Sequence, residues 1–355
     1  MNTQATPEPR DPAGLHAAWQ ALNTDEPGLR IRDAAARLGV SEAELLATEC
    51  GVTVTRLEGD WKALLHELAA LGTVKTITRN ESAVHETTGK YTNVDIPGTL
   101  GVTLGEGIDL RHYMQHWHLG FAQDVSKEKR RLRSLQFFDA DGTAVHKVYL
   151  TESSDVAVYD ALVAKYRAAN QSPEQPVSAS AEHYAPVADE EVDVEGLRNY
   201  WHELPDAHHF YAMLKRFRVD RAQALRLAEP ELARPVGTDA FCRLLDAAAE
   251  AGTEIMIFVG SPGVAQIYTG PVKKLRRIGP WYNVLDPAFN LHLRDDHIVR
   301  AWIVRKGSAV ERVTSLEIYD AQDRLIAQMF GKRKPGIPES AGWHALLDTL
   351  EPLAA

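Results

Sequence analysis

The chain has 355 residues and a formal net charge of −10, with 45% hydrophobic and 25% charged residues. This is the composition of a globular protein long enough for two domains. No apolar run reaches the roughly 18 residues of a membrane span, and the first residues carry no secretory pattern. The acidic charge argues against general nucleic-acid binding, and two cysteines are too few for a disulfide framework, so we expect a cytoplasmic protein without membrane insertion.

The first half of the chain is predicted to place helices before strands. Residues 1–13 are polar and Pro-rich, and we expect them to be disordered. Apolar spacing and turn residues then predict elements over 14–168. Helices are expected at 14–24, 30–37, 41–49 and 60–71, strands near 74–79, 82–86, 100–104, 110–122, 132–139 and 144–150, and a closing helix near 154–168.

The second half repeats this order after a linker. Residues 169–193 are rich in Pro, Ser, Ala and acidic residues and lack an apolar period. Helices are expected at 196–203, 206–217, 220–228 and 238–250, strands near 254–259, 264–268, 289–293, 298–305, 313–320 and 325–330, and a last helix near 340–350. The sequence predicts an α+β fold of two repeats, 14–168 and 194–355, each with helices and a large, mostly antiparallel sheet.

Matching segments indicate that the halves are duplicated. LQFFDADG at 135–142 corresponds to LEIYDAQD at 316–323, an alternating strand followed by a turn. GVSEAELL corresponds to RVDRAQAL, in which Ser41 and Asp220 are expected to cap a helix. The matches occur in the same order about 180 residues apart, which favours an internal repeat.

Most motif signals are absent or weak. The chain has no phosphate-binding loop, dinucleotide fingerprint, nucleophile elbow or zinc-protease motif. Residues 32–46 are similar to the first part of a helix-turn-helix, but Glu42 and Glu44 would repel phosphates.

A group of three histidines is a candidate zinc site. On a helix, His112 and His116 would share one face, and on a strand His112, His116 and His118 would share a face with Met114. No carboxylate lies nearby in the motif, so histidines on a surface or a sheet face are the favoured interpretation.

The segment DAHHFYAMLKRF, residues 206–217, is the most informative. It predicts a helix with His208 in its first turn and an apolar stripe of Phe210, Met213, Leu214 and Phe217. Most such histidines serve packing or lie on the surface, but a neutral imidazole beside an apolar pocket is also a suitable axial ligand for haem iron.

At this point the chain resembles the HemS/HmuS-type haemin transport proteins, also called haemin-degrading factors, of Gram-negative bacteria. The resemblance covers about residues 27–350. It rests on the helix just described and on several other segments: RNESAVH (79–85), IDLR (108–111), YTGPVKKLRRIGPWYNVLD (268–286), FNLHLR (289–294), AWIVRK (301–306) and QMFGKR (328–333).

The resemblance implies a two-half fold and a set of haem-site residues. The axial ligand corresponds to His208, and an arginine that approaches the haem on its far side corresponds to Arg111. The remaining positions carried over by motif are propionate or pocket partners: Arg221, Lys306, Gln328, Phe330 and Arg333. From the residues alone, Arg221, Lys306 and Arg333 also fit solvated or locally capping positions.

Three departures from the family bear on the site. His209 follows His208 and is an alternative ligand, and Phe330 stands where relatives commonly have tyrosine. The region of the first half that matches His208, near Gly28–Arg30, has no histidine. We therefore expect one principal haem site in the second half, with a weaker site in the first half left open.

The resemblance also implies a role in bacterial haem uptake and iron acquisition, with haem b as ligand. As an enzyme, the protein would open haem oxidatively and release iron, with Arg111 as the distal catalytic residue and a reductase as external electron donor. As a carrier, it would receive haem from an importer ATPase and permease and deliver it to a separate haem oxygenase. Both functions stay open, while the charge disfavours a third, a haem-responsive DNA regulator.

Overall fold

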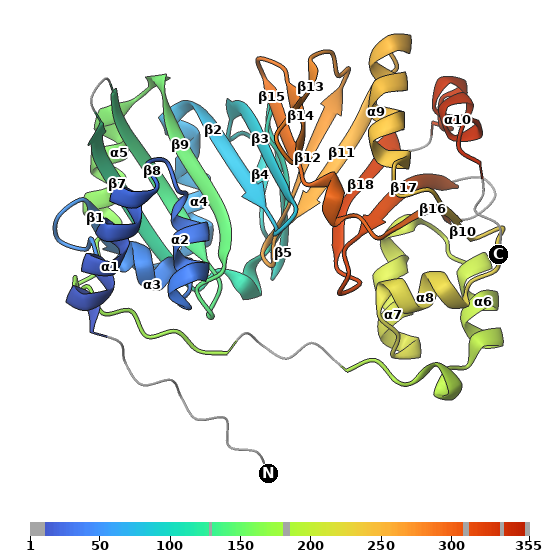
Figure 1. Cartoon of the computed structure of the whole chain (residues 1–355), viewed down its shortest axis with the longest axis horizontal. Coiled ribbons are helices and arrows are strands. Elements are labelled where there is room, and N and C mark those ends of the chain that lie inside the picture. Colours follow the sequence, from blue (N-terminus) through green and yellow to red (C-terminus); the bar gives the residue numbers. More distant parts are fainter. Residues whose placement is uncertain (1–10, 128–129, 180–184, 308–311, 334–336, 352–355) are drawn as a thin grey trace. The chain divides into compact units, whose positions relative to one another are not determined.

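The computed structural model describes residues 11–127, 130–179, 185–307, 312–333 and 337–351 (Figure 1). The chain forms two compact units. Unit 1 comprises Met1–Arg79, Glu86–Ala181 and Ser261–Ala265, and unit 2 comprises Asn80–His85, Glu182–Gly260 and Gln266–Ala355. Neither unit is therefore one continuous stretch of sequence.

Unit 1 begins with helices and continues with strands. Its helices are α1 (Pro12–Asp25), α2 (Ile31–Leu38), α3 (Glu42–Ala47), α4 (Trp61–Glu67) and α5 (Val156–Tyr166), with 3-10 turns η1 (Leu68–Leu71) and η2 (Met114–His116). Its strands are β1 (Val54–Leu57), β2 (Gly72–Arg79), β4 (Val94–Asp95), β5 (Leu100–Leu104), β6 (Asp109–Tyr113), β7 (Leu119–Lys127), β8 (Arg130–Phe138) and β9 (Ala144–Ser154).

Unit 2 repeats this plan. Its helices are α6 (Val194–His202), α7 (Phe210–Phe217), α8 (Arg221–Leu227), α9 (Ala240–Ala251) and α10 (Ala341–Asp348), with 3-10 turns η3 (Asp189–Glu191), η4 (Ala207–His209) and η5 (Asp295–His297). Its strands are β10 (Ala233–Val236), β11 (Ile255–Gly260), β13 (Leu275–Ile278), β14 (Trp281–Leu285), β15 (Phe289–Leu293), β16 (Arg300–Lys306), β17 (Val313–Tyr319) and β18 (Leu325–Gly331).

Two further strands are divided between the units. The first residues of β3 (Ala83–Lys90) belong to unit 2, and the first residues of β12 (Val264–Gly270) belong to unit 1. In unit 1 the strand order is β1-β7-β8-β9-β2-β3, and a second group is β12-β6-β5-β4. In unit 2 the corresponding orders are β10-β16-β17-β18-β11-β12 and β3-β15-β14-β13.

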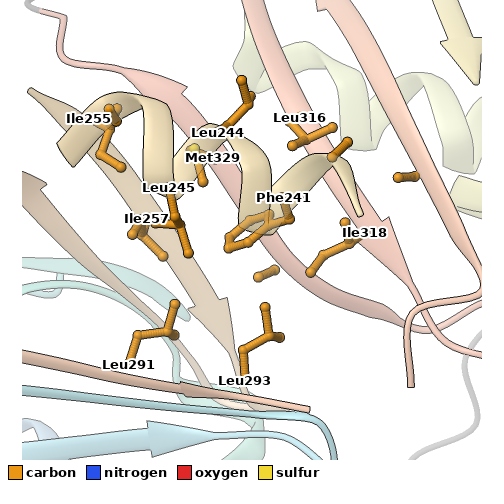
Figure 2. Close-up of a cluster of buried hydrophobic side chains, with 14 of the residues drawn as sticks. Phe241, Leu244, Leu245, Ile255, Ile257, Leu291, Leu293, Leu316, Ile318 and Met329 are labelled. Atoms are coloured by element: carbon orange, nitrogen blue, oxygen red, sulfur yellow. The ribbon is translucent and has the colours of Figure 1, made fainter. Parts of the chain in front are cut away.

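The main core of unit 2 lies between α9 and the strands (Figure 2). Phe241, Leu244 and Leu245 of α9 are fully buried against Ile257 of β11 and Leu316 of β17. Full burial of each such side chain stabilises the fold by about 1.5–3 kcal/mol. This packing fixes one face of β17 and so determines which side chains project from the other.

The opposite face of β17 carries polar side chains. Successive residues of a strand point to opposite faces, so Ser315, Glu317 and Tyr319 project away from Leu316 and Ile318. A second apolar cluster, which includes Val304 and Tyr319, joins this face to α6, α7 and α8. The candidate site is built here.

The duplication predicted from the sequence is confirmed in the local geometry. The side chains of Ser41 and Asp220 both accept the backbone N–H three residues later and complete a capping box at the start of α3 and α8. Each of these helices follows a left-handed C-cap residue, Gly39 with φ 65° and Arg218 with φ 54°. The two halves therefore form the same turn between two helices, although the residues at the C-cap and N-cap positions differ.

The predicted α+β class is confirmed, with strand pairs in antiparallel register. The predicted single strand over 110–122 is wrong, because the 3-10 turn η2 separates β6 from β7. The predicted helix over 206–217 begins with η4 instead of a regular α-helical turn. Five short strands were not predicted: β1, β4, β10, β13 and β14.

The structure describes only part of the N-terminal stretch and of the linker. Residues 1–10 of the stretch expected to be disordered lie outside the described residues, and α1 begins at Pro12. Residues 180–184 of the expected linker also lie outside them. The repeat boundaries 14–168 and 194–355 stay a prediction. Within the described parts of the chain, no helix combines the length and apolar character required to cross a membrane.

Candidate functional site

The turn that carries the two adjacent histidines leads directly into α7. The turn η4 contains His208 and His209, and α7 starts at Phe210. The predicted apolar stripe is confirmed, since Phe210, Met213 and Leu214 are buried and Phe217 packs against the same cluster. The chain thus places exposed His209 directly before a helix whose inner face is anchored.

The two histidines differ in what the structure describes. The side chain of His208 lies outside the described part, so its role as ligand stays a prediction. His209 is half exposed, and its Nδ1 lies 3.1 Å from Oδ1 of Asp206. This contact gives His209 a local partner.

A buried ion cluster lies on the face of β16, β17 and β18 that meets α8. Its centre is Glu317, which is fully buried. The Arg221 guanidinium donates to both Glu317 oxygens, from Nη2 to Oε1 at 2.7 Å and from Nε to Oε2 at 2.8 Å. Lys306 Nζ also donates to Oε1. The two predicted cations therefore meet on one carboxylate.

Neutral side chains complete the coordination of Glu317. Ser315 Oγ and Gln328 Nε2 donate to its Oε1 at 2.9 and 2.8 Å, and the Tyr319 hydroxyl donates to its Oε2 at 2.6 Å. Buried charges are tolerated when they are paired and hydrogen-bonded in this way. Within the described residues, two cations face one anion in this cluster, which leaves one excess positive charge.

The cluster changes the acidity of its members. Burial alone would raise the pKa of Glu317, but Arg221 and Lys306 hold that pKa well below its ordinary value. Burial, and then repulsion by Arg221, lower the pKa of Lys306 to about 8, although Glu317 acts in the opposite direction. Lys306 is therefore mainly protonated at neutral pH, and the excess positive charge is retained.

Phe210 connects the cluster to α7. The Phe210 ring lies 4.6 Å from Lys306 Nζ and 5.0 Å from the Arg221 guanidinium carbon, both measured to the ring centroid. Its ring also meets Trp201 edge to face at 4.8 Å. Trp201 in turn donates from Nε1 to the carbonyl of Arg305 in β16 at 2.8 Å. The start of α7 is thus attached to the sheet through aromatic and cationic contacts.

The same sheet face continues as a half-buried apolar surface. Gln328 and Phe330 of β18 pair with Phe258 and Met256 of β11, and all four side chains are half-buried. The rings of Phe330 and Phe258 lie 4.9 Å apart. The structure therefore brings Arg221, Lys306, Gln328 and Phe330 to one face, as expected for one site.

Two further predicted basic residues are not members of the ion cluster. Arg333 is half-buried and follows the end of β18 by two residues. Arg111 belongs to unit 1, where Nη1 donates to Oδ1 of Asp109 and to the carbonyl of Leu110. Tyr113 lies two residues after Arg111 in β6 and so shares its strand face, whereas Trp117 follows the turn η2 and does not continue that face.

The histidines proposed for zinc do not share a face. Buried His112 lies in β6 with Nε2 2.9 Å from Thr103 Oγ1, whereas Nδ1 of His116 and of His118 lie 2.9 and 3.1 Å from the Asp139 carboxylate. The shared strand face was wrong because η2 interrupts the alternation. The favoured interpretation is right for His112, which lies in the sheet strand β6, and for His118, which is half exposed, but not for His116, which is buried in η2. Among the described residues, no cluster suited to a metal ion occurs.

The first half lacks the cations of this cluster. By the repeat alignment, Gln136 occupies the position of Glu317, and Glu42 occupies that of Arg221. The strand registers agree, since Gln136 pairs with Phe121 and Glu317 with Trp302, which places Val125 at the position of Lys306. At the corresponding place, unit 1 buries the ion pair of Glu42 with Lys147.

Comparison with known proteins identifies the family. The sequence model described as the haemin-degrading HemS/ChuX domain matches residues 39–166 and 218–350. The chain belongs to this family, as its motifs indicated. The two matched regions correspond to the two repeats.

Three relatives illustrate the similarity. The haemin transport protein HemS of Yersinia enterocolitica is 39% identical over 93% of this chain and 95% of its own length. The haem-bound structure of PhuS, a heme-binding protein from Pseudomonas aeruginosa, has a TM-score of 0.93 and 43% identity over 97% of this chain and all of that chain. The heme-degrading enzyme ChuS of Escherichia coli O157:H7 has a TM-score of 0.90 and 33% identity over 96% of this chain and all of that chain.

Sequence reasoning missed Glu317, Ser315 and Tyr319. A signal was present, because these three residues alternate with apolar ones in TSLEIY and so share one strand face. A carboxylate is an unexpected component of a site for an anionic ligand, and its burial depends on cations that lie 11 and 96 residues away in sequence.

Proposed function

We propose that this protein is a cytoplasmic haem-binding protein of bacterial haem uptake and iron acquisition. Haem b binds to unit 2 with His208 as axial ligand, and the ring is opened oxidatively to release iron. The observation that carries the proposal is the combination in unit 2 of a buried cluster with one excess positive charge and an adjoining half-buried aromatic face. A flat apolar ring with two carboxylates has the complementary chemistry.

The residues present fit haem in charge and in apolar character. Within the described part of the chain, Arg221 Nη1 makes no hydrogen bond, and the Arg221 side chain is 26% exposed, so it can offer a charge-assisted bond to a propionate. Phe330 and Phe258 offer apolar area to the ring, and Arg333 adds a further cation. The absence of the cations from unit 1 supports one principal site in unit 2.

The chain's own residues then have distinct tasks. When bound, haem supplies the iron chemistry that reacts with oxygen. A neutral imidazole at His208 holds the iron on one face, and Arg111 is the proposed distal residue that donates hydrogen bonds on the other. His209 is the alternative ligand. Electrons come from an external donor such as a reductase.

The alternative function is a non-catalytic carrier. It is favoured by the similarity to HemS of Yersinia enterocolitica, which is named as a haemin transport protein. As a carrier, the protein would receive haem from an importer ATPase and permease and deliver it to a separate haem oxygenase. Arg111 would then hold the ligand without assisting a reaction.

A haemin titration followed by reductant in air separates the two functions. With catalase present, growth of a Soret band followed by its loss, with an open-chain product and free iron, supports degradation. A Soret band that persists supports the carrier. No Soret change would refute both.

Replacement of His208 tests the ligand. We expect His208→Ala to abolish the wild-type Soret signature of ligated haem or to weaken binding at least about tenfold, because loss of the axial bond exceeds about 1.4 kcal/mol. The matched control is His209→Ala, which should retain the wild-type spectrum. An unchanged spectrum in His208→Ala, with a changed one in His209→Ala, would assign the ligand to His209.

A further inference from the structure

The Glu317 carboxylate has no direct use for an anionic ligand. A buried anion repels a propionate, and all of its described hydrogen bonds run to protein groups. Removing one partner of such a cluster would leave uncompensated buried charge. The presence of the Glu317 carboxylate between Arg221 and Lys306 therefore requires another explanation.

The two cations differ in their freedom to meet a ligand. The side chain of Lys306 is 5% exposed, and its ammonium is enclosed by Glu317, Phe210 and the repelling charge of Arg221. The side chain of Arg221 is 26% exposed, and its Nε and Nη2 donate to Glu317, whereas Nη1 makes no hydrogen bond among the described residues. A direct ligand contact is thus suited to Arg221 and not to Lys306.

Phe210 is the point at which the cluster meets the histidine turn. It is 3% exposed and stands two residues after His208 in sequence. Cation–π contacts of this kind gain strength when they are desolvated, up to about 2 kcal/mol. Both cations must remain in place for the Phe210 ring to keep these contacts, and Glu317 is the group that holds them.

From this geometry we infer that Glu317 is a positioning residue. It gathers Lys306 and Arg221 against the Phe210 ring and thereby fixes the start of α7, where His208 is the proposed haem ligand. Lys306 shares this positioning role, whereas Arg221 both positions Phe210 and faces the ligand. The inference rests on the proposed function, because it concerns the geometry of the His208 bond to haem.

The test compares Glu317→Gln with Glu42→Gln. Both replacements remove a buried carboxylate that pairs with a lysine, but Glu42 lies in the pair of unit 1. The readouts are the electron paramagnetic resonance and Soret spectra of the ferric haem complex of the full chain, and the dissociation constants of haem and of haem dimethyl ester. We expect Glu317→Gln to give more than one ligation signature, whereas Glu42→Gln keeps the single wild-type signature.

The esterified ligand separates positioning from direct contact. Because Glu317 acts through the protein, Glu317→Gln should weaken binding of the dimethyl ester about tenfold, the effect of one lost desolvated cation–π contact. Binding of haem should weaken less than binding of the ester, because the replacement also removes the negative charge that repels the propionates. Arg221→Gln should weaken haem more than the ester, since only free propionates make the ionic contact.

A second variant covers the case in which Glu317→Gln does not fold, as judged by circular dichroism. Phe210→Leu keeps an apolar side chain and the whole ion cluster, so it should fold and still show mixed ligation. If folded Glu317→Gln keeps the wild-type signature and an affinity for the dimethyl ester within twofold of the wild type, or if Phe210→Leu does so, the inference is refuted. A wild-type chain without a Soret change, or a His208→Ala chain that keeps its spectrum, refutes the proposed ligand instead, and with it the inference.

Discussion

His85 is a neutral residue of the core. His85 is fully buried in unit 2, and its ring packs against Phe289 with centroids 4.9 Å apart. Burial lowers the pKa of His85 to about 3, with the backbone of Ile257 acting weakly in the opposite direction. The segment RNESAVH, which helps to define the family resemblance, thus contributes a core residue at its last position.

The pKa of His85 predicts a dependence of stability on pH. Between its unfolded pKa near 6.5 and about 3, the unfolded chain binds a proton that the folded chain does not, so stability is lost as the pH falls through this window. We expect His85→Phe to reduce this loss by about 1 kcal/mol between about pH 7 and about pH 5.5. Urea unfolding at both pH values measures the difference.

Exposed His66 provides the control. His66→Gln should give a curve of unfolding free energy against pH that parallels the wild type. If the His85→Phe curve also runs parallel to the wild type, His85 does not resist protonation in the folded chain.

At the scale of single residues, the sequence predicted members of the ion cluster but not its centre. Arg221, Lys306 and Gln328 follow from motif positions, and the structure brings all three to Glu317. Glu317 was missed because local patterns do not show which buried carboxylate a distant cation will meet. The tertiary fold determines which carboxylate a distant cation meets. It likewise determines that His116 and His118 both contact Asp139.

Among the elements, long periodic segments were predictable and short ones were not. The strands predicted at 100–104 and 289–293 match β5 and β15. In each, apolar residues recur at every second position, and turn residues stand on both sides of the segment. Two- to four-residue strands such as β4 and β10 are too short to show a period. The three-residue turn η2 does not disturb the alternation enough to separate β6 from β7 in the sequence.

The matched helix ends predict opposite effects of substitution. Gly39 and Arg218 hold the same left-handed conformation, which costs a residue with a side chain about 1–2 kcal/mol. We expect Gly39→Ala to lower the free energy of unfolding by about 1 kcal/mol and Arg218→Gly to raise it by up to about 1 kcal/mol. Chemical denaturation measures both, and effects of equal sign would contradict the shared cap geometry.

For the whole molecule, the repeat in the sequence does not coincide with the compact units. Ala83 is fully buried in the core of unit 2, although it lies in the first half of the chain. Val264 is fully buried in the core of unit 1, although it lies in the second half. No local pattern in β3 or β12 indicates this division, so it could not be predicted from the duplication.

This division predicts how the molecule responds to cleavage. A protease site inserted between the exposed residues Pro173 and Glu174 would separate the two halves of the sequence but not the two units. We expect the cleaved halves to elute together from a sizing column under native conditions, because each unit contains buried residues from both. The halves should separate in denaturant. Separation in native buffer would contradict the assignment of β3 and β12.

The divided strands also affect how the protein is made on the ribosome. Ser261–Ala265 complete unit 1, yet they are translated about 80 residues after Ala181. At roughly 5–20 residues per second, this interval is about 4–16 s. During that time the first half of the chain has been made, but β12, the strand that pairs with β6, has not. The nascent chain therefore completes neither unit until most of it has been synthesised.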